Sequence, residues 1–237
     1  CSVRPIEMAR AYAIFGNGGK EVTPMAIRTV EDKNGNVILT PELDIRKEQT
    51  AKGDKIQIIS PQTAFVMTKL LEQTVNGGGT LAGQKGRFEY KAENGRSYRM
   101  PAAGKTGTTQ NWADAWTCGF TPYFASAFWF GFDKPGQSLG LRITGSTLAG
   151  YAWGKFMGEI HKDLPSKDWN KPLDGVIEAT VCSVSGQILT ENCGDHKTTQ
   201  WFLAGTVPTE LCSVHSNTTN SSIAIDRLKK EMYQSGQ

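Results

Sequence analysis

The stretch that decides the fold runs from residue 101 to residue 122 and reads "PAAGKTGTTQNWADAWTCGFTP". With "FASAFWFGF" at residues 124–132, it sets three short β-rich runs one after another, joined by links rich in turn-forming residues. Runs this close along the chain can pair as antiparallel neighbours, because a short turn is enough to connect them. We therefore predict an antiparallel sheet with strands within residues 100–108, 113–121 and 124–132.

Two segments that precede this sheet carry helical patterns. Residues 5–15, "PIEMARAYAIF", have apolar side chains at helical spacing, a proline in the first turn and a glycine-rich stop. Residues 60–75 open on Ser60-Pro61, which suits a helix start, and end shortly before three glycines. The apolar face of this second helix is expected to hold Ala64, Met67, Leu70 and Leu71.

A third helix is expected after the sheet. Residues 145–165 place four side chains four positions apart, and Pro165 closes the segment. These side chains, which would face the sheet, are Leu148, Ala152, Phe156 and Ile160. The fold class is therefore α/β (α+β), an antiparallel sheet covered by helices. Between the first two helices, Asn34-Gly35 predicts a hairpin turn, because both residues tolerate positive φ angles.

The residue composition and the predicted secondary structure change beyond Lys171. Short β-like runs, three of the five cysteines and two of the three histidines replace the helical pattern. We place a larger domain at residues 1–165 and a small β-rich C-terminal appendage at residues 166–237, with a helical tail at residues 225–233.

Composition and charge exclude several classes of protein. The 26 basic and 23 acidic side chains give a net charge of +3, too small and too dispersed to indicate nucleic acid or an anionic membrane surface as a partner. The longest apolar-and-small run is residues 124–132, whereas a membrane-spanning helix needs about 20 residues. The composition is that of an ordinary globular protein.

Gly104-Lys105-Thr106 matches the end of the phosphate-binding pattern G-x-x-x-x-G-K-[ST]. That pattern requires a glycine at the position of Arg99, and it requires free backbone N–H groups before the lysine, whereas Pro101 has none. The nucleotide-binding interpretation therefore fails.

The other interpretation of Lys105-Thr106-Gly107-Thr108 is a catalytic strand. An enzyme that acylates itself on a peptide ending in a carboxylate must hold that carboxylate, orient the scissile carbonyl and stabilise an oxyanion. Lys105 supplies a cation, and Thr106 and Thr108 supply hydroxyls on one face of a strand. Gly107 leaves room for a substrate backbone. Such a tetrapeptide alone is more often a solvated edge or turn, so its context decides.

That context resembles the serine acyl-transferases of the penicillin-binding and β-lactamase group, which carry K-T-G together with S-x-x-K and S-x-N. "RPIEMARAYAIFGNGG", "SPQTAFVMTKLLEQTVNGGGT", "AGKTGTTQNWADAWTCGFTP" and "SAFWFGFD" occur here in the same order as in that group. Residues 2–164 resemble the C-terminal half of the transpeptidase domain of a class A, bifunctional penicillin-binding protein of the 1A type. The cysteine-bearing end resembles the tails that follow this domain.

By this resemblance, Lys105, Thr106, Gly107 and Thr108 form the catalytic strand. Lys105 would set the electrostatics and proton traffic at the serine, Thr106 and Thr108 would bind the substrate carboxylate, and the Thr108 N–H would be an oxyanion donor. The implied substrates are peptidoglycan stem peptides ending in D-Ala-D-Ala, β-lactams are the implied covalent inhibitors, and no cofactor is implied. Further residues expected to line the substrate groove are Thr109, Gln110 and Asn111.

No serine of the chain begins an S-x-x-K or S-x-N motif. Because K-T-G comes last of the three motifs in this family, the nucleophile and its base are expected upstream of Cys1, with the glycosyltransferase domain and membrane anchor that the resemblance implies. The main partner would then be the missing N-terminal half of the same protein, and the location would be extracytoplasmic, at the periplasmic face of the inner membrane. We predict that the isolated chain is inactive. The alternative is a non-catalytic module that binds wall peptides or partner proteins.

The cysteines and histidines of the appendage allow two kinds of cross-link. Cys193-x-x-His196 and Cys212-x-x-His215, with Cys182 nearby, could form a tetrahedral zinc site. A disulfide competes, because the resemblance implies an oxidising compartment, although three cysteines cannot all pair among themselves. A zinc site, a disulfide and the absence of both remain open alternatives, and no metal ligand is assigned. Of the other residues, we expect Trp116, Cys118 and Phe120 to pack in the core and His161 to lie on the surface.

Overall fold

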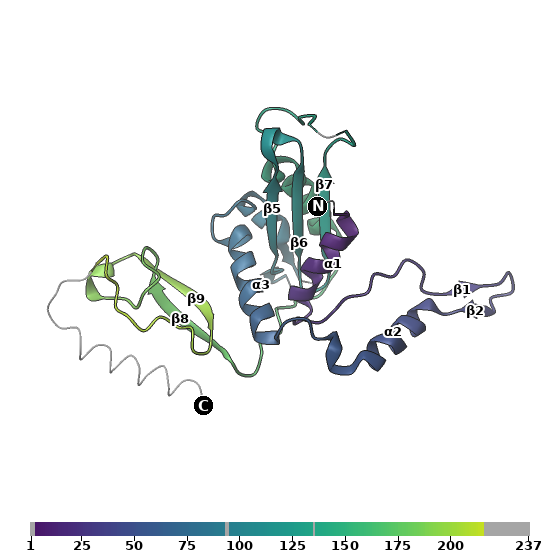
Figure 1. Cartoon of the computed structure of the whole chain (residues 1–237), viewed down its shortest axis with the longest axis horizontal. Helices are drawn as coiled ribbons and strands as arrows, with labels where there is room; N and C mark the ends of the chain where they lie inside the picture. Colours follow the sequence, from purple (N-terminus) through teal and green to yellow (C-terminus); the bar gives the residue numbers. More distant parts are fainter. Residues whose placement is uncertain (1–2, 93–94, 135, 216–237) are drawn as a thin grey trace. The chain divides into compact units, whose positions relative to one another are not determined.

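The computed structural model describes residues 3–92, 95–134 and 136–215, and the chain divides into two compact units (Figure 1). We call Cys1–Asn170 the sheet unit and Lys171–Gln237 the tail unit. The sheet unit contains α1 (Pro5–Gly16), β1 (Val30–Glu31), β2 (Val37–Leu39), α2 (Pro41–Lys52), η1 (Gly53–Ile56), α3 (Pro61–Asn76), η2 (Ala82–Phe88), β3 (Glu89–Lys91), β4 (Ser97–Arg99), β5 (Ala103–Thr108), η3 (Gln110–Trp112), β6 (Ala115–Phe120), β7 (Ala125–Phe130), η4 (Gly145–Ala149) and α4 (Gly150–Ile160). The tail unit contains β8 (Val176–Cys182), η5 (Glu191–Cys193) and β9 (Lys197–Leu203).

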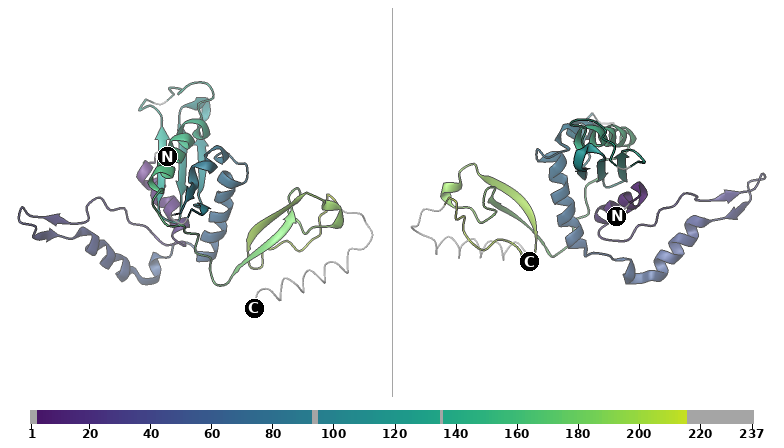
Figure 2. Two further views of the ribbon diagram at one scale, coloured as in Figure 1. Left: turned by 180° about the vertical axis from the view of Figure 1, so that it is seen from behind. Right: turned by 45° about the horizontal axis from the view of Figure 1, so that its top comes forward.

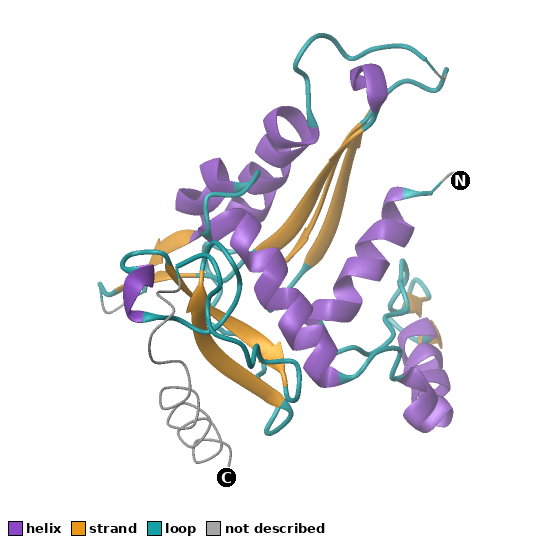
Figure 3. Ribbon diagram, turned by 60° about the vertical axis from the view of Figure 1, so that its left-hand side comes forward, coloured by secondary structure: helices purple, strands orange, loops and turns teal. Residues whose placement is uncertain are grey.

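The centre of the sheet unit is the antiparallel sheet β5-β6-β7, as the sequence predicts. Helices cover both of its faces (Figure 3). Phe120 of β6 packs its ring against α1, whereas the neighbouring Gly119 lies under the ring of Trp153 in α4. Because successive side chains of a strand point to opposite faces, α1 and α4 lie on opposite sides of the sheet. Figure 2, seen from behind, shows α4 across the face away from α1.

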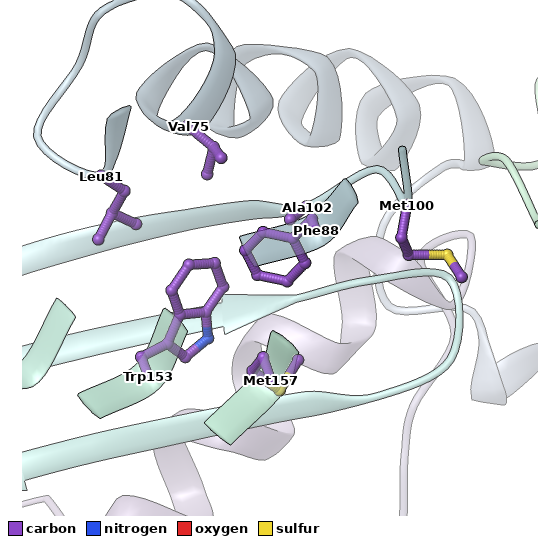
Figure 4. Packing of buried hydrophobic residues seen from close by; sticks show 7 residues of the cluster. All are labelled: Val75, Leu81, Phe88, Met100, Ala102, Trp153 and Met157. Atoms are coloured by element: carbon purple, nitrogen blue, oxygen red, sulfur yellow. The ribbon is translucent and has the colours of Figure 1, made fainter. Parts of the chain in front are cut away.

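The largest apolar core forms between the sheet, α3, η2 and α4. Trp153 is fully buried there, and its ring centroid lies 5.3 Å from that of Phe88. Gly119 makes this packing possible, because a Cβ at that position would lie 2.5 Å from the Trp153 ring. The cluster, drawn in Figure 4, comprises Val75, Leu81, Phe88, Met100, Ala102, Trp153 and Met157.

The helix bounds agree with the sequence patterns, but the two predicted apolar faces are only partly correct, Ala64 being buried as predicted. In α3, Met67 and Leu70 are exposed, and the buried residues are Ala64, Phe65, Thr68 and Val75. In α4, Phe156 and Ile160 are exposed, and the helix packs through Trp153, Met157 and three glycines. These glycines let η2 approach the helix closely: a Cβ at Gly154 would lie 2.5 Å from the Gln84 side chain. Spacing alone therefore located the helices but not the side that meets the rest of the unit.

The segment between α1 and α3 holds both a confirmed turn and a missed helix. β1 and β2 pair antiparallel around the predicted turn, in which Gly35 takes a positive φ of 82° while Asn34 does not. The Asp32 carboxylate accepts the N–H groups of Asn34 and Asn36, so side-chain bonding supports this turn. The stretch that reads only as polar contains α2, whose residues are all at least partly exposed. The β3–β4 hairpin was likewise not predicted.

His161 corrects another prediction, because it is fully buried rather than on the surface. Its Nδ1 lies 2.6 Å from the Met157 carbonyl oxygen, which can only accept, so Nδ1 carries the proton. Nε2 then accepts a hydrogen bond from the Thr121 hydroxyl, 2.7 Å away. The Thr121 oxygen in turn accepts the N–H groups of Tyr123 and Phe124. Burial lowers the pKa of His161, so this network holds a neutral ring.

The tail unit is built on the antiparallel pair β8–β9, which matches the β-like runs of its sequence. The compact sheet unit reaches Asn170, and Trp169 packs on Phe120 with ring centroids 5.4 Å apart. The helix predicted at residues 225–233 lies outside the described residues. In the described part of the chain, no helix is both long enough and apolar enough to cross a membrane.

Candidate functional site

The predicted catalytic residues lie on β5, the strand at one edge of the sheet. Its register with β6 pairs Lys105 with Cys118, Thr106 with Thr117, and Gly107 with Trp116. Thr106 and Thr108 therefore share the face on which η4 packs, as predicted. Lys105 and Gly107 share the opposite face, that of Trp116 and Cys118.

The alternation of hydrogen-bonding direction along β5 shows which of its backbone groups point away from β6. In an antiparallel pair, each residue directs its N–H and C=O to the same side. The N–H of Thr109 bonds to Asp114 in the turn, whereas the C=O of Gly104 points outward and accepts a 2.9 Å hydrogen bond from the Thr74 hydroxyl. The outward set is thus Gly104, Thr106 and Thr108. A peptide that added a strand to this edge would meet the N–H and C=O groups of Thr106 and Thr108.

Lys105 is exposed and turns its ammonium toward the same edge. Nζ donates to the carbonyl oxygen of Thr106 at 2.8 Å. Although its Cβ lies on the other face from those of Thr106 and Thr108, the long side chain thus brings its charge to the outward edge. A cation, two hydroxyls and outward N–H groups meet there, which is the donor set needed by an anionic peptide terminus.

Two segments outside the tetrapeptide hold its hydroxyls in place. The hydroxyls of Thr80 and Thr106 lie 2.9 Å apart, and the N–H of Gly145 donates to the Thr108 hydroxyl at 2.9 Å. The Thr117 hydroxyl donates to the Gly145 carbonyl at 2.8 Å, which fixes the start of η4 on the sheet. Only glycine fits at position 145, because a Cβ would lie 2.3 Å from the Gly107 carbonyl oxygen.

Thr80 and Gly145 are site residues that sequence patterns did not predict. Thr80 follows the glycines that end α3, and Gly145 opens the segment that leads into α4. Neither lies in a short motif that names a chemical role. Only the packing of these segments against β5 brings them to the site.

Gly104 and Gly107 have different surroundings. A Cβ at Gly104 would lie 2.9 Å from the Cys118 carbonyl oxygen, so the sheet itself requires glycine there. A Cβ at Gly107 would meet only the Trp116 Cβ, at the ordinary contact distance of 3.5 Å. The packing of the described residues therefore gives no reason for a glycine at position 107.

Three further predicted residues lie in the turn after β5. The Thr109 hydroxyl donates to the Asp114 carboxylate at 3.0 Å and accepts the Asp114 N–H at 2.8 Å, so it is engaged in closing the turn. Gln110 and Asn111 lie in η3, and Asn111 has a φ of 57°. Asp114 also accepts from the Trp129 indole at 2.9 Å, and its oxygens thereby connect the turn to β7.

Two of the three side chains expected to pack in the core, those of Cys118 and Phe120, do so. Cys118 and Phe120 are buried, and burial raises the pKa of the Cys118 thiol to about 11. This thiol is therefore uncharged at neutral pH and unsuited to act as a nucleophile. Trp116 is partly buried, and its ring lies 6.2 Å from that of Trp129.

Comparison with known proteins accounts for both units. Residues 1–138 match the family described as the penicillin binding protein transpeptidase domain, and residues 172–217 match the C-terminal domain of penicillin-binding protein 1A. Penicillin-binding protein 1A of Clostridium tetani is 34% identical over 218 residues, which cover 91% of this chain and 25% of the relative. The protein of the same name from Clostridium novyi is 35% identical over 216 residues, 89% of this chain and 22% of the relative.

Solved structures show the same relationship. The crystal structure of penicillin-binding protein 1A from Haemophilus influenzae superposes with a TM-score of 0.70 at 25% identity, covering 90% of this chain and 33% of that chain. The penicillin-binding protein PonA1 from Mycobacterium tuberculosis gives a TM-score of 0.53 at 29% identity, with 72% of this chain and 42% of that chain covered. The chain spans about a quarter of the length of the curated relatives it matches.

Proposed function

Since this chain belongs to the penicillin-binding protein transpeptidase family, we propose that it forms the substrate-terminus side of a serine D,D-transpeptidase that cross-links peptidoglycan. The observation that carries this proposal is the outward edge of β5. There the Lys105 ammonium, the Thr106 and Thr108 hydroxyls and the outward backbone groups of both threonines lie along one strand. These groups suit a peptide that ends in a carboxylate and adds to the sheet as a further strand.

In the proposed reaction, a serine of the longer protein attacks the carbonyl carbon of the D-Ala-D-Ala bond of a stem peptide. The serine loses its proton, an ester bond forms, and the terminal D-Ala leaves with a protonated amine. The amine of a second stem peptide then attacks the ester, which releases the serine and makes the cross-link. A β-lactam would acylate the same serine.

Each residue of the strand would have its own part in this reaction. Lys105 would favour the anionic substrate and the deprotonated serine through its charge. The Thr106 and Thr108 hydroxyls would bind the substrate carboxylate, and the Thr108 N–H would stabilise the oxyanion, an effect typically worth about 10²–10³ in rate. Groove contacts from Thr109, Gln110 and Asn111 belong to this proposal as well.

The longer protein would supply what this sequence lacks. We propose that it carries the S-x-x-K and S-x-N motifs, a glycosyltransferase domain and a membrane anchor, with its active site outside the cytoplasmic membrane. Apolar side chains of α1 and α3 are exposed in the described structure, among them Ile6, Met67 and Leu70. They would be covered by the half of the domain that bears the serine.

The first experiment reads the coding DNA upstream of Cys1 and produces both the full reading frame and this chain alone. Both are then incubated with a fluorescent penicillin, and their intact masses are measured by mass spectrometry. The full protein should gain one penicillin, this chain alone should gain none, and Lys105→Ala in the full protein should slow acylation by about 10²-fold or more. An adduct on the isolated chain, or Lys105→Ala acylated at the normal rate, contradicts the proposal.

The second candidate is a non-catalytic module that binds wall peptides, because the outward edge of β5 could bind a peptide terminus without any chemistry. It gains support if the reading frame upstream of Cys1 contains neither serine motif. In that case the isolated chain should bind a stem pentapeptide ending in D-Ala-D-Ala in calorimetry, and Thr108→Val should weaken this binding.

A further inference from the structure

The tail unit gathers four potential metal ligands at one point. The Sγ atoms of Cys182, Cys193 and Cys212 and one ring nitrogen of His215 all lie within 4.8 Å of one another. His215 Nδ1 is 3.4 Å from the Cys182 sulfur and 3.3 Å from the Cys212 sulfur. All three cysteines are buried.

The two nitrogen–sulfur distances fit the edges of a coordination tetrahedron. With Zn–S bonds of about 2.3 Å and Zn–N bonds of about 2.0 Å, tetrahedral angles put sulfur and nitrogen roughly 3.5 Å apart and two sulfurs roughly 3.8 Å apart. Three thiolates and one imidazole form a ligand set that prefers zinc over magnesium or calcium.

The backbone fixes each cysteine separately from the sulfur contacts. The N–H of Cys182 donates to Gln187, and the N–H of Cys212 donates to Ile188, each at 2.8 Å. The Cys193 N–H donates to Thr190 at 3.1 Å. The end of β8, the end of η5 and the segment at Cys212 are thus held with their sulfurs pointing to one centre.

Hydrogen bonds around the four ligands are of the kind that hold metal ligands in place. The Ser185 hydroxyl donates to the Cys212 sulfur at 3.2 Å, and the Thr190 N–H donates to the Cys193 sulfur at 3.3 Å. The Thr190 hydroxyl donates to the His215 carbonyl at 2.9 Å. Donors of this kind orient ligands and stabilise thiolate charge.

His196, one of the residues of the Cys-x-x-His pairs, is not among the four. Its ring stacks on that of His215, with centroids 5.0 Å apart and planes 7° from parallel. Cys182, outside both pairs, takes the remaining position. The pairs seen in the sequence therefore contribute one histidine instead of two.

The small size of the tail unit favours a cross-link or a bound metal as part of what stabilises its fold. Its buried cluster consists of the three cysteines, with Leu189 packed against it. A unit this small seldom buries enough apolar surface to be stable without a disulfide or a metal. A disulfide would use two of the three thiols and would leave the third and the His215 imidazole aimed at the same point. A metal uses all four groups.

We propose that Cys182, Cys193, Cys212 and His215 bind one zinc ion that holds the tail unit together. The site is structural, because all four tetrahedral positions are filled by the protein and none is open to a substrate. It is independent of the transpeptidase chemistry proposed for the sheet unit.

The test uses the whole 237-residue chain, purified without chelator or reductant. Plasma emission spectrometry should find one zinc per chain. Replacement of zinc by Co²⁺ should give the visible absorption bands of tetrahedral cobalt and a thiolate charge-transfer band. Thiol titration after unfolding in chelator should find all 5 cysteines free.

Matched variants assign the ligands. His215→Gln should reduce the zinc content at least tenfold under dialysis against a weak chelator, whereas His196→Gln, the neighbouring stacked histidine, should keep the normal content. His215→Cys should restore binding with a stronger charge-transfer band in the cobalt form, which guards against a variant that simply fails to fold.

Two results would overturn the zinc site. One is a chain without zinc that has a disulfide, seen as two fewer thiols and a mass about two daltons lower. The other is a failure of the ligand assignment, seen either as equal zinc loss in the His196→Gln and His215→Gln variants or as cobalt spectra without tetrahedral bands.

Discussion

Replacing Gly107 by alanine separates the needs of the fold from the needs of the substrate. A Cβ there would meet only the Trp116 Cβ, at 3.5 Å, and the φ of Gly107 is not positive. The fold therefore accepts the methyl group without strain. Alanine also restricts the unfolded chain, which stabilises a protein by about 0.4–1 kcal/mol where the conformation is compatible. We expect stability to be unchanged or slightly raised.

Gly104→Ala is the matched control on the same strand. Its Cβ would lie 2.9 Å from the Cys118 carbonyl oxygen and 3.2 Å from the Gly119 Cα. Both atoms belong to the paired backbone of β6 and cannot move alone. Overpacking of this kind costs about 1–3 kcal/mol, and each kcal/mol lowers the melting temperature of a domain this size by roughly 2–4 °C.

Gly107→Ala, which should leave stability unchanged, is expected to impair acylation. In the full-length protein, a substrate strand beside β5 passes over Gly107, and a methyl group there displaces it. A shift of about 1 Å at a reacting carbonyl can cost about 10²-fold in rate. We expect Gly107→Ala to lower the second-order rate constant for acylation by fluorescent penicillin about 10²-fold at an unchanged melting temperature.

The rate constant and the melting temperature are measured on the same samples. If Gly107→Ala is acylated as fast as the unchanged protein, no substrate backbone approaches this glycine and the proposed binding mode is wrong. If Gly107→Ala melts several degrees lower, the conclusion that a Cβ fits at position 107 without strain is wrong instead.

Three further predictions concern the supporting contacts. Thr121→Val should destabilise the sheet unit by about 1–3 kcal/mol in urea unfolding followed by tryptophan fluorescence, because it leaves the buried His161 Nε2 without a donor; a loss under about 0.5 kcal/mol would refute this role. Because the folded-state pKa of His161 is lowered, its contribution should be fully present above the unfolded pKa of about 6.5 and decline as the pH falls below it, and His161→Gln should flatten that decline. Thr80→Val should slow acylation of the full-length protein about fivefold, equivalent to about 1 kcal/mol, because it frees the Thr106 hydroxyl. Thr80→Ser should restore the rate, and equal rates for the two variants would exclude a positioning role for Thr80.

Much of the fold was predictable because local patterns and pairing agree. The spans of α1 and α3, the three central strands and the turn at Gly35 follow from periodicity and turn chemistry. The missed α2 is mostly polar, and its two large apolar residues, Leu43 and Ile45, do not recur at helical spacing. The buried face of α4 differs from the predicted one because its glycines let η2 approach where a larger apolar residue would have been expected. In α3, Phe65, Thr68 and Val75 are buried outside the predicted face.

The candidate site, like the fold, has one part that was predictable from the sequence and one part that depends on tertiary packing. Lys105, Thr106 and Thr108 are neighbours along one strand, so the sequence by itself determined that they come together and that two hydroxyls share a face. Only the tertiary structure decided what holds those hydroxyls, because Thr80 and Gly145 are distant in the chain and meet β5 through packing. It also decided which of the tail histidines joins the three cysteines, because ligand geometry depends on how separate segments are folded onto one point and not on spacing along the chain.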